Sequence, residues 1–310
     1  RQLDPSVDPN SIRRAVELAL EDATTSDLKV KVVEASGPAN FGKAEAASAL
    51  TPSPKVVIGP NRLKDHELLN PKIWNELYLP LIGAGSSEKE MALVSGYSVR
   101  QQVKAMVSQL RRSSLSRIAI VRDQNGTDER KAKIISEALE RAKLKLAGPF
   151  GPGQCASAEV REQLAVQQAL IFLTSPDVAA GCLSAIEGGG GKRVSQIIGD
   201  ADWIANGSFD PALDGAWVVA PGLDAKWDFF NKYRNKFRKH PTLESIFVYD
   251  YIVLLSVLSQ RYVSVDQIYD YMTSTVGIKG AAGFLTYEKK AAQRPTALYR
   301  IMNGRIELSS

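Results

Sequence analysis

Residues 117–175 read RIAIVRDQNGTDERKAKIISEALERAKLKLAGPFGPGQCASAEVREQLAVQQALIFLTS. The first and last runs of this stretch, RIAIVRD (Arg117–Asp123) and ALIFLTS (Ala169–Ser175), are almost continuously apolar, which is typical of strands buried on both faces. Helical spacing of apolar residues between them predicts helices over about 128–142 and 158–166, with a strand over 143–147. Strands alternating with helices of this length predict a parallel sheet covered by helices on both faces.

The same alternation continues on both sides of this stretch. Before it we expect a helix from Asn10 or Ser11, strands over 28–36, 55–60 and 78–85, and helices over 38–50 and 103–110. After it we expect strands over 195–200 and 215–221, helices over 177–186, 227–239, 243–260 and 265–275, and a final two-stranded hairpin with an Asn303-Gly304 turn. Two successive rounds predict two sheets, and 310 residues suffice for two lobes.

Composition excludes several classes of protein. Apolar residues make up 44% of the chain and charged residues 24%, as in folded globular proteins. The 39 basic and 34 acidic residues are interleaved, so no basic block predicts a nucleic-acid partner. Apolar runs such as Ile252–Leu255 fall far short of the roughly 18 residues that a membrane-spanning helix needs.

The chain also lacks the usual residues of metal, cofactor and catalytic sites. Two cysteines and two histidines, none at ligand spacing, predict no metal site and no His-based catalytic triad. GAGSSE (Gly83–Glu88) has a glutamate where a dinucleotide fingerprint needs its third glycine, and EGGGGKR (Glu187–Arg193) follows a helix and lacks the Ser or Thr of a P-loop. We therefore expect no cofactor and no enzymatic activity.

Several runs, taken in order, carry a resemblance to a known family. They are VVIGP, LPLIGAGSS, RIAIVRD, ALIFLTS, QIIGDADW, GAWVVAPG, FFNKYRNKFRKHPTLESIFVYDYIVLL and GAAGFLTYEKKAAQRPTALYRIMNGRIE. With this order and spacing the chain resembles the type I periplasmic binding proteins, specifically the branched-chain amino-acid (Leu/Ile/Val) substrate-binding family of ABC transporters. The resemblance covers nearly the whole chain.

The resemblance implies two doubly wound parallel-sheet lobes with a ligand cleft between them. One lobe would comprise residues 1–100 plus 221–282, and the other residues 101–220 plus 283–310. It implies a periplasmic or extracellular solute-binding protein that captures an amino acid or related small carboxylate for a membrane transporter permease. The alternative is a ligand-sensing extracellular domain of a signalling protein with a diverged pocket.

In the first lobe the resemblance points to two loops. Ser86 and Ser87 lie on the loop whose hydroxyls and backbone N–H groups bind a ligand carboxylate in the family, and the alternative for a serine there is a plain helix N-cap. Asn61 and Arg62 lie on the loop after VVIGP. Arg62 either pairs with a carboxylate or is a solvated surface residue.

In the second lobe the candidate ligand-binding residues follow three strands. They are Asp123, Asn125, Thr174, Ser175, Asp200, Asp202 and Trp203. The family's acidic residue for the ligand ammonium group falls on Ala201 or on Asp202, depending on the register. The aromatic residues that usually cover the ligand are absent at Thr174-Ser175 and around Ser245, which leaves Trp203 as the candidate aromatic cover.

Two departures from the family pattern concern the first lobe. The family begins with an apolar strand, and nothing before Ser11 supplies it, so we expect that the natural protein has residues before Arg1. The connection between Tyr97 and Val103 is short for the family, which indicates either missing residues or a trimmed cleft edge.

The fold implied by the resemblance also bears on the two cysteines. Right-handed connections place the segments before and after strand 169–175 on one face of the sheet, so Cys155 and Cys182 become neighbours. Two alternatives follow, a disulfide or two buried thiols in helix packing. A disulfide would agree with an oxidising, extracytoplasmic location.

Overall fold

A computed structural model of the chain describes residues 9–23, 29–30, 56–58, 77–79, 93, 96–123, 126–190, 194–223, 228–262, 264–274, 277–288 and 291–309. The chain folds into two compact units. The first comprises Arg1–Ser98 and Gly222–Pro295, and the second comprises Val99–Pro221 and Thr296–Ser310. The chain therefore passes between the units three times.

The third boundary lies later than predicted. The boundary was predicted after Ala282, whereas the first unit extends to Pro295. The reason is hydrogen bonding: β9 (Gly283–Glu288) is antiparallel to β8 (Ile278–Gly280), and β10 (Ala291–Gln293) pairs with β9. β9 and β10 consequently complete a three-stranded sheet of the first unit rather than entering the second.

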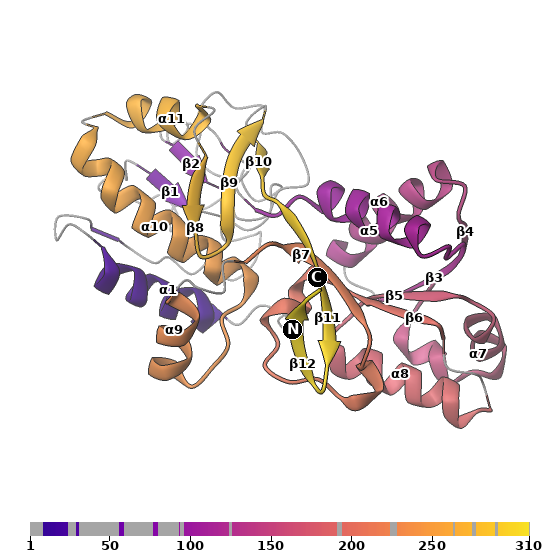
Figure 1. Cartoon of the computed structure of the whole chain (residues 1–310). Helices are drawn as coiled ribbons and strands as arrows, with labels where there is room; N and C mark the ends of the chain where they lie inside the picture. The colour runs from indigo at the N-terminus through magenta and orange to yellow at the C-terminus, as the bar shows by residue number, and fades with distance from the viewer. Residues whose placement is uncertain are drawn as a thin grey trace, which may run out of the picture. The chain divides into compact units, whose positions relative to one another are not determined.

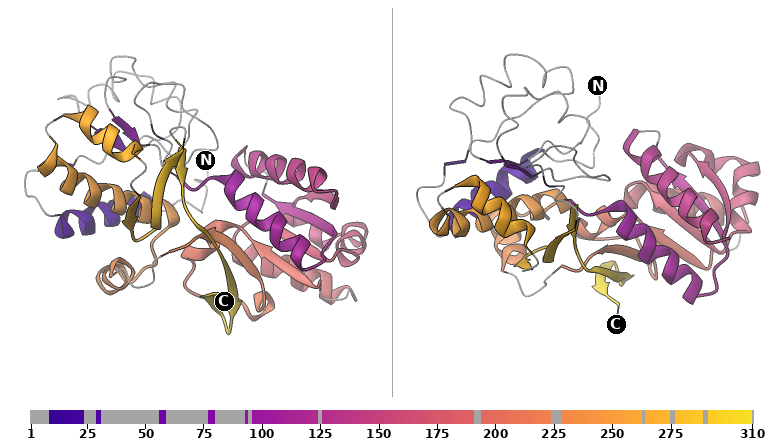
Figure 2. Two further views of the ribbon diagram at one scale, coloured as in Figure 1. Left: turned by 45° about the horizontal axis from the view of Figure 1, so that its top comes forward. Right: turned by 90° about the horizontal axis from the view of Figure 1, so that it is seen from above.

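The second unit contains a seven-stranded sheet in the order β12-β11-β7-β6-β5-β3-β4. Five strands are parallel: β3 (Arg117–Arg122), β4 (Lys145–Phe150), β5 (Ala169–Leu173), β6 (Gln196–Gly199) and β7 (Trp217–Pro221). β11 (Thr296–Met302) and β12 (Arg305–Leu308) are antiparallel and join through the predicted Asn303-Gly304 turn, both residues of which have positive φ. Figure 2 shows this hairpin at the β7 side of the sheet.

Helices cover both faces of this sheet. α5 (Val99–Arg112) and α6 (Gly126–Arg141) contact each other on one face, and α7 (Ala158–Ala165) and α8 (Pro176–Gly188) lie on the other (Figure 1). Every residue of β5 and of β7 is buried, as expected for strands covered on both sides. The predicted doubly wound parallel sheet is therefore confirmed for this unit.

The structure contains a disulfide between Cys155 and Cys182, whose Cα atoms are 5.3 Å apart. Cys182 lies in α8, and Cys155 lies in η2 (Pro152–Ala156), a short 3₁₀ helix directly before α7 rather than in α7 itself. Both residues are buried. The bond joins the crossovers on either side of β5, which right-handed connections bring to one face of the sheet.

Helices make up most of the described part of the first unit. α1 (Pro9–Asp22) packs on α10 (Leu243–Arg261) and on α9 (Phe229–Phe237), and α11 (Val265–Thr273) contacts β9. β1 (Val56–Ile58) and β2 (Leu77–Leu79) form a parallel pair. The strand predicted over 28–36, apart from Lys29 and Val30, and the helix predicted over 38–50 lie outside the described residues.

α10 is the central helix of the first unit. It is long and apolar enough, by length and composition, to cross a membrane, but 67% of its most apolar window is buried inside the protein. It contacts α1, and the ring of Tyr249 packs against that of Phe229 of α9 in a tilted arrangement with centroids 4.3 Å apart. A helix that is apolar on all sides is expected in this position, because neighbouring elements cover it.

Candidate ligand-binding site

The second unit's sheet changes its winding direction between β3 and β5. β4 follows β3 in sequence and lies on one side of it, whereas β5 lies on the other side. In an open parallel sheet the loops diverge at such a point and leave a crevice outside the carboxyl ends of the strands. The predicted residues Asp123, Thr174, Ser175, Asp200 and Asp202 follow β3, β5 and β6, so the structure brings them to one edge of the sheet.

Thr174 and Ser175 lie where β5 ends and α8 begins. Ser175 is exposed and is the N-cap of α8, and its Oγ accepts a hydrogen bond from the N–H of Val178 at 3.4 Å. Thr174 is buried, and its hydroxyl donates to the carbonyl of Ser175. The backbone of this helix start is a poor anion site, because Pro176 has no N–H and the N–H of Val178 is bonded to Ser175. Asp177 also places a carboxylate in the first turn.

Asp200 is a buried and fully engaged carboxylate. Its Oδ1 accepts hydrogen bonds from the N–H of Ala201 at 2.7 Å and from Nε2 of Gln102 at 3.4 Å. Its Oδ2 lies 2.7 Å from Nζ of Lys131, which extends from α6. Asp200 therefore caps η3 (Ala201–Ala205) and is neutralised within the protein, so it is a poor partner for a ligand ammonium group.

Lys131 and Gln102 are site residues that sequence reasoning missed. They lie on α6 and α5, separated from Asp200 by 69 and 98 positions in the sequence. A lysine or glutamine beside the apolar stripe of a helix is ordinary in sequence, so no local signal distinguishes these two. Only the packing of both helices against the sheet brings them to Asp200.

Asp202 is the more accessible of the two neighbouring carboxylates. Its side chain is 42% exposed, compared with 7% for Asp200, and its Oδ2 lies 3.5 Å from Nζ of Lys131. Ala201, the other candidate for the amine site, is buried and carries no charge. Of the two alternatives left open by the sequence, Asp202 is the one with the chemistry and the exposure to meet a cation.

The structure argues against Trp203 as the aromatic cover of a ligand. The residue is 2% exposed, and its indole packs over Gly199, where a Cβ atom would collide with it. Its Nε1 donates to the carbonyl of Thr174 at 2.7 Å. Trp203 thus belongs to the core of the second unit and fixes the end of β5 relative to η3.

Of the remaining predicted residues, the structure describes only Asp123. Asp123 follows β3, and its carbonyl accepts a hydrogen bond from Nη1 of Arg122 at 3.0 Å. Asn125 and the four residues of the first unit, Asn61, Arg62, Ser86 and Ser87, lie outside the described residues. Among the residues that the structure describes, there is no group of three or more His, Cys, Asp or Glu side chains that could hold a metal ion.

Comparisons with known proteins establish the fold by structure rather than by sequence. No sequence model of a protein family matches the chain, and no curated protein matches it. Among solved structures, a periplasmic branched-chain amino-acid ABC-transporter ligand-binding protein of Burkholderia xenovorans has a TM-score of 0.77 and 13% identity, over 100% of this chain and 92% of that one.

Two further solved structures carry ligands. An ABC-transporter substrate-binding protein of Desulfitobacterium hafniense in complex with Leu has a TM-score of 0.72 and 13% identity, over 97% and 95% of the two chains. A solute-binding protein of Rhodopseudomonas palustris in complex with 3,4-dihydroxybenzoic acid has a TM-score of 0.75 and 12% identity, over 96% and 90%. The predicted fold class is therefore confirmed: the chain has the type I periplasmic-binding-protein fold.

Proposed function

We propose that the protein is an extracytoplasmic solute-binding protein that captures an amino acid or related small carboxylate and delivers it to an ABC-transporter permease. The observation that carries this proposal is the position of Asp202 beyond the carboxyl ends of the parallel strands, with a side chain that is 42% exposed. Asp202 can pair with a ligand ammonium group, and the hydroxyl of the exposed Ser175 at the same edge can donate to a carboxylate. An amino acid carries both groups.

The structural neighbours support the same ligand class. Leu and 3,4-dihydroxybenzoate, which two of them bind, share a carboxylate, and only Leu has an amine. We propose that the carboxylate is the constant requirement and that Asp202 adds a preference for an amine. The disulfide supports a periplasmic or extracellular location, because such bonds persist in oxidising compartments.

A thermal-shift screen tests this proposal. The panel contains amino acids, benzoate, hydroxybenzoates, primary amides and sugars, and a ligand that binds only the folded state raises the melting temperature. We expect shifts with carboxylates and the largest with an amino acid, followed by calorimetry to measure affinity. Shifts with sugars or amides alone would contradict the proposed ligand class.

A second candidate function is a ligand-sensing extracellular domain of a signalling protein. One structural neighbour, an extracellular ligand-binding receptor of Desulfohalobium retbaense, is a longer chain, of which this chain covers 56% (TM-score 0.70, 16% identity). The complete gene separates the two functions. A neighbouring permease gene favours transport, and a fused kinase or membrane-spanning segment favours sensing.

A further inference from the structure

A groove of about 520 Å³ lies between α5 and α6 on the second unit. It does not include the residues at the ends of β3, β5 and β6. One face of α5 is buried, and it consists of Val99, Gln102, Val103, Met106 and Leu110. The groove lies beside this buried face, and its apolar lining consists of Val103, Val107, Ile134 and Ala138.

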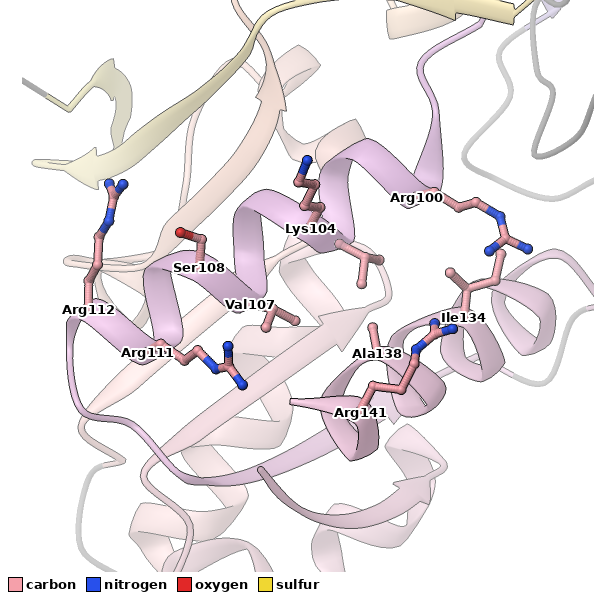
Figure 3. Close-up of a pocket in the computed structure, with 10 residues that line it drawn as sticks. Arg100, Lys104, Val107, Ser108, Arg111, Arg112, Ile134, Ala138 and Arg141 are labelled. Atoms are coloured by element: carbon pink, nitrogen blue, oxygen red, sulfur yellow. The ribbon is translucent and has the colours of Figure 1, made fainter. Parts of the chain in front are cut away.

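Cations surround this apolar lining. The positively charged residues that line the groove are Arg100, Lys104, Arg111, Arg112 and Arg141, and no acidic residue among those described lines it. Figure 3 shows Arg111 and Arg141 extending from the two helices toward the space between them. Across the whole chain basic and acidic residues are nearly balanced, at 39 and 34, so composition does not explain this concentration of one sign.

These five cations make almost no polar contacts with the described residues of the protein. Within the described part of the chain none of the five side chains forms an ion pair, and only Arg111 makes a side-chain hydrogen bond, from Nη2 to the carbonyl of Ala142 at 2.8 Å. That contact places a cation at the C-terminal end of α6, where the helix dipole favours it. The other four cations have no such contact with the described residues, and like charges held close together repel each other.

The dimensions of the groove indicate its occupant. Arg100 and Arg112 are separated by twelve residues of helix, which corresponds to about 18 Å along α5. One small anion cannot reach cations spread over that length. A flat membrane surface meets protruding lysines and arginines but cannot fill an apolar floor between two helices. An elongated segment with apolar side chains along one face and carboxylates flanking that face satisfies both features.

We propose that the groove between α5 and α6 binds an acidic amphipathic segment of a partner protein. Apolar side chains of that segment cover Val107, Ile134 and Ala138, while its Glu and Asp carboxylates pair with the guanidinium groups at the rim. The cations also attract an acidic partner from a distance and speed association at low ionic strength. This proposal does not depend on which small molecule the protein carries.

The test uses fluorescein-labelled helical peptides and measures binding by fluorescence anisotropy. The probe is a peptide of about sixteen residues, long enough to span the groove, with leucines along one face and glutamates flanking that face. Its control has lysines in place of the glutamates. We expect the glutamate peptide to bind the full chain, at least tenfold more tightly than the lysine peptide at low salt, and to weaken as salt increases.

A matched pair of variants locates the binding. Arg100→Glu/Arg141→Glu removes two cations of the groove that hold no hydrogen bond or ion pair with the described residues. Lys145→Glu/Arg305→Glu makes the same change in net charge at exposed positions that do not line the groove. We expect the groove variant to lose at least tenfold in affinity and the control variant less than threefold. Unchanged urea midpoints show that both variants remain folded.

Three results would overturn the proposal. The first is equal affinity of the two variants for the glutamate peptide, and the second is equal affinity of the protein for the glutamate and lysine peptides. The third is binding to phosphatidylserine vesicles that depends on Arg100 and Arg141 without binding to the peptide. That last result would assign the same cations to a membrane surface.

Discussion

The ion pair between Lys131 and Asp200 holds the carboxyl end of β6 against α6. Asp200 is buried and its side chain is 7% exposed, so removing its partner leaves a charge in a poorly hydrated position. We expect Lys131→Met to lower the free energy of unfolding by about 2 to 4 kcal/mol, since breaking a buried pair from one side is costly. Urea unfolding measures this loss.

Two variants control this prediction. Lys133→Met changes an exposed lysine on the same helix and should alter stability by less than about 0.5 kcal/mol. Lys131→Met/Asp200→Asn removes both charges and should recover part of the loss, because no unpaired charge remains. Equal stability of the Lys131 and Lys133 variants would show that the pair does not stabilise the fold.

Asp202 makes a prediction about ligand choice. If Asp202 meets the ammonium group, Asp202→Asn should weaken binding of an amino acid by about 1.5 to 3 kcal/mol, the usual worth of a hydrogen bond to a charged group. The corresponding acid without the amine should bind the variant and the wild type equally. Calorimetry with both ligands measures the difference, and Glu162→Gln, an exposed change on α7, serves as the control. An equal loss for both ligands would assign Asp202 a structural role instead.

For single residues of the candidate site, the sequence could predict their position at the ends of the strands but not their contacts. The rule that ligands bind beyond the carboxyl ends of parallel strands selects the positions after β3, β5 and β6, which the structure places at one edge of the sheet. It cannot tell that Asp200 is paired and Asp202 accessible, because Lys131 comes from a distant helix. It also cannot tell that Trp203 packs inward over Gly199, since a tryptophan after a strand suits a core and a pocket equally.

Among the elements, the β8–β9 hairpin of the first unit is hydrogen-bonded to one half-buried carboxylate. Asp250 of α10 accepts hydrogen bonds from the N–H groups of Ala281 and Ala282, the two residues of the hairpin loop, at 2.7 and 2.9 Å. Burial raises the pKa of Asp250 from 3.8 to about 6, against the opposing effect of Arg294 and the two N–H groups. The hairpin is thus joined to α10 through a titrating group.

This raised pKa has a definite consequence for stability. The folded state favours the protonated carboxyl, so this contribution to stability is fully present below about pH 4 and is lost as the pH rises through about 6. From this group alone we expect the free energy of unfolding to fall by about 2 to 3 kcal/mol between pH 4 and pH 7. Asp250→Asn does not titrate, so its deficit relative to the wild type should shrink over that range. If urea unfolding shows the same difference in stability between the variant and the wild type at pH 4 and pH 7, the raised pKa is contradicted.

The disulfide also links two elements, because it joins η2 to α8 across 27 residues of sequence. Closing a loop of this length restricts the unfolded chain and contributes about 3 to 4 kcal/mol in the chain-entropy account. We expect dithiothreitol to lower the urea midpoint of the second unit by a corresponding amount. We also expect mass spectrometry of non-reduced protein to find no free thiol. Two free thiols in protein from its native compartment would contradict the bond.

Elements were predictable where their apolar pattern is strong. β3, β5, β6 and β7 and the helices between them begin and end within a few residues of their predicted bounds, because buried strands and amphipathic helices have distinct periods. The prediction that the first unit ends after residue 282 was wrong for a different reason. Whether residues 283–293 pair with β8 or enter the other sheet depends on backbone hydrogen bonds, which hydrophobic periodicity does not record.

For the whole molecule, the two units differ in how they are built from the chain. The second unit consists of residues 99–221 and a C-terminal hairpin, β11–β12, that hydrogen-bonds to β7. It has its own sheet, helices on both faces and a disulfide, which are the properties of a domain that folds alone. Thr296 pairs with Pro221 in the antiparallel register, so the end of the first segment and the start of the second are neighbours.

This register makes an isolated second unit feasible. We expect residues 99–221, joined by a short Gly-Ser linker to residues 296–310, to fold as a monomer that unfolds cooperatively in urea and gives a well-dispersed amide NMR spectrum. Residues 99–221 alone should aggregate or unfold at lower urea, because they leave the buried strand β7 as an uncovered sheet edge. If the joined protein shows no cooperative transition, the second unit owes its stability to the first. If the shorter protein is equally stable, β11–β12 is not part of the folding unit.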